Sequence, residues 1–70
     1  MSKFRVTNPV PAVLRLEGRH EYVNLPIGAV LTTLREVSKP VLGMLHVICE
    51  KHEYAVLGAD LVRKCDPLRV

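Results

Sequence analysis

Residues 12–25, AVLRLEGRHEYVNL, decide the fold of this 70-residue chain, because two alternating runs flank a glycine there. Gly18 and Arg19 at the centre suit a two-residue type II′ turn, which joins two antiparallel strands. The turn predicts a register in which Ala12 pairs with Leu25. One face of this hairpin is then aliphatic and the other mainly polar, which is typical of a half-buried pair of strands.

Residues 44–58 predict a second hairpin with Lys51 and His52 at its tip and with Cys49 paired to Tyr54. One face of this hairpin is assigned to the core. The opposite face is too apolar for a solvated surface, and contiguous exposed apolar area usually marks a contact site. The predicted interface consists of the residues on that face, which are Met44, His46, Ile48, Ala55 and Leu57.

The remaining segments complete an all-β domain. Residues 29–37 are rich in β-branched side chains and predict a strand, and residues 38–43 predict a loop. Asp60 is placed to cap a single helical turn at Leu61, and residues 62–65 predict a last short strand. We therefore expect a small five-stranded barrel over 12–66, with one short helical turn before its last strand. The two ends of the chain are an extended N-terminal arm (1–11), which contains two prolines, and a C-terminal tail (67–70).

This order of elements resembles that of the SH3-like small barrels. Residues 22–65 are similar in particular to a set of small uncharacterised bacterial proteins with an SH3-like barrel fold. The stretches that carry the resemblance are Pro26-Ile27-Gly28-Ala29-Val30-Leu31, which opens a strand, and the turn Gly58-Ala59-Asp60-Leu61. The chain departs from the pattern at the tip of the second hairpin, where such proteins often have glycine and this chain has Lys51. The resemblance implies a fold and no activity.

The composition excludes several classes of protein. Hydrophobic residues make up 49% of the chain, which is too many for a disordered segment. No run approaches the ~20 apolar residues of a membrane helix, so we expect no membrane partner. Two cysteines are too few for a disulfide framework. We therefore expect free thiols and a cytoplasmic location.

The net charge of +3 raises the question of nucleic-acid binding. Residues 6–62 contain five Lys and Arg against six Asp and Glu, so the excess positive charge lies at the two ends of the chain. Small barrels bind nucleic acid with cations interleaved among stacking aromatic rings. On the first hairpin, Arg15, Arg19 and Tyr22 form one cluster of that kind, which is the possible nucleic-acid contact.

The chemistry-bearing residues predict no catalytic, cofactor or metal site. His46, Cys49 and His52 have the residue types of a zinc site, but residues three apart in a strand point to opposite faces. Cys65 follows Arg63 and Lys64 and is the better candidate for a reactive thiol. Glu50 and Glu53 flank a solvated hairpin tip, whereas acid–base catalysis by two carboxylates needs a desolvated cleft.

Two function hypotheses follow from these patterns. The first is a non-enzymatic small interaction module that self-associates or binds a protein, with a homodimer as the default because dimers are the commonest assemblies. A chain of this size has a thin margin of core stability, which association with another chain increases. The alternative is a nucleic-acid-binding small barrel. No cofactor is expected for either.

Overall fold

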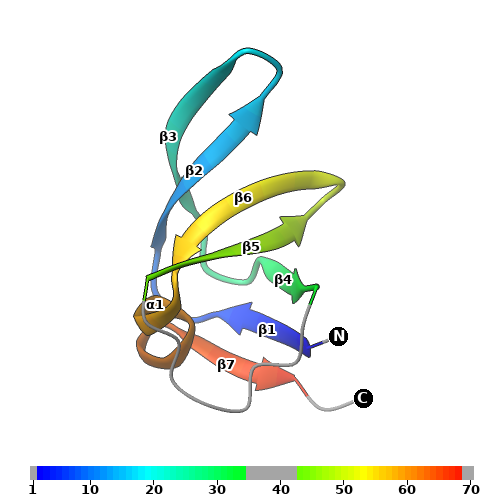
Figure 1. The fold of residues 1–70 in the computed structure, drawn as a ribbon. Helices are drawn as coiled ribbons and strands as arrows, with labels where there is room; N and C mark the ends of the chain where they lie inside the picture. Colours follow the sequence, from blue (N-terminus) through cyan, green and yellow to red (C-terminus); the bar gives the residue numbers. More distant parts are fainter. Residues whose placement is uncertain (1, 35–42, 69–70) are drawn as a thin grey trace.

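A seven-stranded antiparallel sheet forms the body of the protein, in the order β3-β2-β6-β5-β4-β1-β7 (Figure 1). The computed structural model describes residues 2–34 and 43–68. The strands are β1 (Ser2–Val6), β2 (Val10–Leu16), β3 (Arg19–Leu25), β4 (Val30–Thr33), β5 (Met44–Cys49), β6 (His52–Leu57) and β7 (Cys65–Leu68). One short helix, α1 (Gly58–Arg63), connects β6 to β7.

The architecture confirms the all-β class, but the expectation of a five-stranded barrel is wrong. The seven strands form one open sheet with β3 and β7 at its two edges. One additional strand comes from the predicted N-terminal arm, since β1 pairs with both β4 and β7. Phe4 and Val6 alternate with polar residues along β1, and both are buried. This alternation of buried apolar and exposed polar side chains is that of a half-buried strand, so residues 2–6 belong to the sheet.

The predicted element boundaries differ from those in the structure at both ends. The divisions proposed at residues 11/12 and 66/67 fall inside β2 and β7. Asp60 does not cap α1, because Leu57 occupies the N-cap position and Asp60 lies in the first turn. The last strand begins at Cys65 instead of residue 62. Most of the loop predicted at 38–43, together with the end of the strand predicted at 29–37, lies outside the described residues.

Both hairpins form, each with a register that differs by two residues from the prediction. In the first, Leu16 pairs with Arg19, so the turn residues are Glu17 and Gly18. Gly18 has φ +74°, a conformation that glycine adopts without steric cost. Because strand side chains alternate with a period of two, a shift of two residues leaves every side chain on its predicted face.

The second hairpin turns at Glu50 and Lys51, and Cys49 pairs with His52. Both turn residues have positive φ, +49° and +70°, which is the requirement of a type I′ turn. That turn suits the right-handed twist of the flanking strands, although neither residue is glycine or asparagine. Here too the faces are as predicted, with Val47 and Val56 buried on one side of the sheet.

The core lies against one face of the sheet, which we call the inner face. Leu61 of α1 and Cys65 at the start of β7 contribute to it as well as the strands. The buried hydrophobic residues are Phe4, Val6, Val10, Ala12, Leu25, Leu31, Val47, Cys49, Val56, Leu61 and Cys65. This inner face leaves the opposite, outer face of the sheet to solvent.

Candidate interaction surface

The outer faces of the two hairpins join into one surface because β2 pairs with β6. Val13 pairs with Tyr22 on β3 and with Ala55 on β6, and Ala55 pairs in turn with His46 on β5. Directly paired residues share a face of the sheet, so these four side chains form one row across four strands. The apolar members of this region are Val13, Tyr22, Met44, Ile48, Ala55 and Leu57, which we call the outer apolar surface.

All five residues of the predicted interface lie on this outer face. Met44 and Leu57 pair with each other and are 49% and 48% exposed. Ile48 and His46 are also exposed, and Ala55 is half-buried. The structure therefore gathers the predicted residues on one side of the β5–β6 hairpin.

An open groove of about 360 Å³ crosses this surface between β3 and β5. Its lining comes from all four strands of the two hairpins and is mostly apolar. The residues are Pro11, Ala12, Val13, Tyr22, Val23, Asn24, Met44, Ala55 and Leu57. Its volume lies in the range of sites that hold small ligands or single large side chains, which is roughly 300–1,000 Å³. The groove is thus a concave apolar feature on the face that the core leaves exposed.

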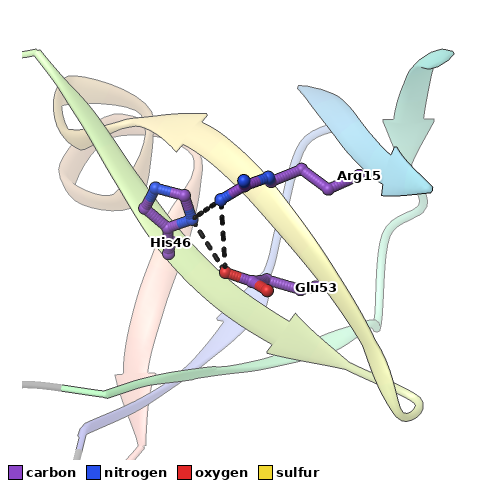
Figure 2. A network of polar contacts seen from close by, with 3 residues as sticks. All are labelled: Arg15, His46 and Glu53. Atoms are coloured by element: carbon purple, nitrogen blue, oxygen red, sulfur yellow. Dashed lines mark hydrogen bonds and ion pairs between the residues drawn. The ribbon is translucent and has the colours of Figure 1, made fainter. Parts of the chain in front are cut away.

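A small polar network of Arg15, His46 and Glu53 lies on the same face, at the β5 end of the row (Figure 2). Nδ1 of His46 lies 2.9 Å from Oε1 of Glu53, a hydrogen bond in which the carboxylate accepts. Nη1 of Arg15 lies 3.9 Å from the same Oε1 and 3.5 Å from Nδ1 of His46. All three side chains are about half-exposed, so water screens their attraction. The network mainly compensates the charge of Glu53 within the face.

The three residues of the possible nucleic-acid contact do not share a face. Tyr22 and Arg15 lie on the outer face, whereas Arg19 pairs with Leu16 and belongs to the other face of the hairpin. Each arginine also lies close to a carboxylate: Arg15 to Glu53, and Arg19 to Glu21 at 3.7 Å. The structure therefore brings together only Tyr22 and Arg15 of the predicted cluster. A neighbouring carboxylate offsets the positive charge of each arginine.

Both cysteines are buried and free. Burial and, to a lesser extent, the nearby carboxylates of Asp60 and Asp66 together raise the pKa of the Cys65 thiol to about 11. The pKa of Cys49 is raised as well, mainly by burial and then by Glu50. A nucleophilic cysteine needs the opposite shift, toward the thiolate. At neutral pH both thiols are protonated and act as small apolar side chains.

The raised pKa of Cys65 predicts a pH-dependent stability. The folded-state pKa lies above the unfolded value, so this contribution is complete below about pH 9 and is lost as the pH rises toward 11. We expect the free energy of unfolding in urea to fall more between about pH 8 and about pH 10.5 in the wild type than in Cys65→Ala. Equal losses in the two proteins would show that Cys65 does not contribute.

The zinc-like triplet is separated as the strand geometry predicts. His46 is exposed on the outer face and Cys49 is buried on the inner face, where it pairs with His52. Within residues 2–34 and 43–68, no three His, Cys, Asp or Glu side chains are grouped so as to hold a metal ion. In the same part of the chain, no helix has the length and apolar character needed to cross a membrane.

Comparisons with protein-family models, with curated proteins and with solved structures return no match for this chain. The resemblance to small SH3-like bacterial proteins therefore stays a prediction.

Sequence reasoning missed the contribution of the first hairpin to this surface. The face of the first hairpin that was predicted to be mainly polar carries Val13 and Asn24, and both line the groove. The residues themselves carry a partial signal, since Val13 and Tyr22 are large apolar side chains on a face otherwise described as polar. What joins them to Met44 and Leu57 is the pairing of β2 with β6, which no local pattern indicates.

Proposed function

We propose that this protein is a non-enzymatic interaction module that self-associates through its outer apolar surface, with a homodimer as the assembly. The observation that carries the proposal is the apolar groove, which extends over both hairpins on the face that the core leaves free. Contiguous exposed apolar area of this kind marks a contact site more often than a solvated surface.

The size of the molecule supports a second copy as the occupant. A chain of 70 residues buries a smaller fraction of its surface on folding than a larger domain does, and it has a narrow margin of stability. A standard interface covers about 800 Å² per partner, which is roughly 15% of the 5212 Å² surface of this chain. A partner that binds only the folded state stabilises that state. Covering this face in a dimer would therefore raise the stability of the fold.

The charges on the outer face are compatible with such an interface. Glu53 is compensated by Arg15 and hydrogen-bonded to His46. Interfaces tolerate charges at their rim, and the main cost arises when a charge is buried without a partner. The network therefore borders the groove without placing an unpaired carboxylate beside it.

The proposal predicts that Met44→Glu converts the dimer into monomers. Two unpaired carboxylates would be buried at a twofold interface, and each costs several kcal/mol, so we expect dimer dissociation to become at least about 100-fold easier. Met44 is half-exposed in the single chain, so the variant should fold. Size-exclusion chromatography with light scattering gives the mass of each protein.

Ile27→Glu is the matched control, because Ile27 is 66% exposed in the connection between β3 and β4, outside the groove. It places the same new charge on the molecule and should leave the dimer intact. Two results would contradict the proposal: a wild-type chain that is monomeric at high concentration, or a Met44→Glu variant as dimeric as Ile27→Glu.

A further inference from the structure

Tyr22 is the most exposed large apolar side chain among the described residues, at 89%. It lies at the midpoint of β3, the edge strand next to the groove, and its side chain is on the outer face. Tyrosine is enriched at the centres of interfaces, because its ring is large and rigid and its hydroxyl is polar. Among the residues of the outer apolar surface, Tyr22 is therefore the strongest candidate for a central contact residue.

The groove offers a site that suits such a ring. Tyr22 lies on its β3 side, and Met44 lies on its β5 side, with β2 and β6 between them. The volume of about 360 Å³ is sufficient for one aromatic side chain. Met44 has a flexible, polarisable thioether that adapts to an aromatic surface. Asn24, also in the lining, presents an exposed amide that can hydrogen-bond with a phenolic hydroxyl.

Symmetry adds a further condition that this surface meets. In a twofold dimer the same patch serves on both chains, so a residue that inserts must share its face with the site that receives it. Tyr22 and the groove share the outer face. Two copies placed with these faces together would each present one ring and one groove.

We infer that Tyr22 of each copy inserts into the groove of the other, against Met44 and Leu57, and that this exchange is the main contact of the dimer. The inference rests on the self-association proposed above and identifies the residue on which it depends. The two rings lie near the twofold axis, and the Arg15, His46 and Glu53 network lies toward the rim.

The first test compares three single substitutions by their dimer dissociation constants in sedimentation equilibrium. Tyr22→Ala should weaken the dimer at least about 100-fold, because each of the two copies loses a central aromatic contact residue. Tyr22→Phe should stay within about 10-fold of the wild type, since only the hydroxyl is lost. Val62→Ala trims another exposed apolar side chain, on α1, and should change nothing. Circular dichroism verifies that each variant is folded.

The second test observes the contact directly and needs no substitution. The chain has two tyrosines and two methionines, so the Tyr22 ring and the Met44 methyl group give few competing NMR signals. In a mixture of isotope-labelled and unlabelled chains, a filtered NOE experiment detects only contacts between different copies. We expect cross-peaks between the Tyr22 ring and the Met44 methyl group.

The outcomes separate this inference from the proposed function. A dimeric wild type that Met44→Glu dissociates, but that Tyr22→Ala leaves intact and that shows no intermolecular NOE from Tyr22, would overturn the inference and leave the proposed self-association standing. Contacts between β3 strands of two copies, without ring contacts to Met44, would also overturn it. A wild type that is monomeric throughout would overturn both.

Discussion

Leu31→Ala is expected to destabilise the fold by about 2–5 kcal/mol, because it removes a fully buried side chain and leaves a cavity. Leu31 lies on β4 between β1 and β5, where its strand has hydrogen-bonded neighbours on both sides. Domains gain roughly 0.05–0.15 kcal/mol of stability per residue, so a chain of 70 residues has only about 3.5–10 kcal/mol in total. The substitution should therefore remove much of the stability, as measured by urea unfolding followed by circular dichroism.

Leu34→Ala is the matched control for this prediction. Leu34 follows the end of β4 and is 58% exposed, so the same chemical change should cost no more than about 0.5 kcal/mol. If the two variants unfold at the same urea concentration, Leu31 is not in the centre of the core and the description of the inner face is wrong.

Phe4→Ala is expected to cost about 3–5 kcal/mol, the typical loss for a buried aromatic side chain. Phe4 is buried on β1, which lies between β4 and β7 and connects the two ends of the chain through the sheet. The measurement is again the free energy of unfolding, with Lys3→Ala on the exposed face of the same strand as control. Equal stabilities of the two variants would mean that residues 2–6 are a peripheral arm.

The faces of both hairpins could be predicted from the sequence, whereas their registers could not. In residues 12–25 and 44–57, side chains alternate between the inner and the outer face with a period of two. Moving the turn by one residue shifts the pairing by two residues, so every side chain stays on its face. The registers depend on which two residues turn. Glu50 and Lys51 adopt positive φ without being glycine or asparagine, so the residue types that usually indicate such a turn are absent there.

Two prolines, Pro11 and Pro67, lie at the predicted boundaries of the barrel, yet in the structure each lies inside a strand. Pro67 lies within β7, where it is tolerated because β7 is an edge strand. Pro11 lies within β2, whose pairing with β6 begins at the next residue, Ala12. Each proline thus occupies a strand at a point where one side of the ladder is open. A sequence pattern cannot show which side that is.

The candidate site was predicted in part, for a related physical reason. The outer face of β5 and β6 is a local property of one hairpin, and its apolar character is visible in the alternation of residues 44–57. The contribution of Val13 and Tyr22 depends on the pairing of β2 with β6, which joins segments about 40 residues apart in the chain. Such non-local pairing is set by the packing of the whole sheet.

Self-association through the outer apolar surface is the central claim, and the mass of the wild-type chain in solution tests it most directly. Sedimentation equilibrium across a range of concentrations should give twice the mass of one chain, falling toward that of one chain on dilution. For Met44→Glu, the mass should already be that of one chain at concentrations where the wild type is still a dimer. A wild-type mass of one chain at every concentration would contradict the account.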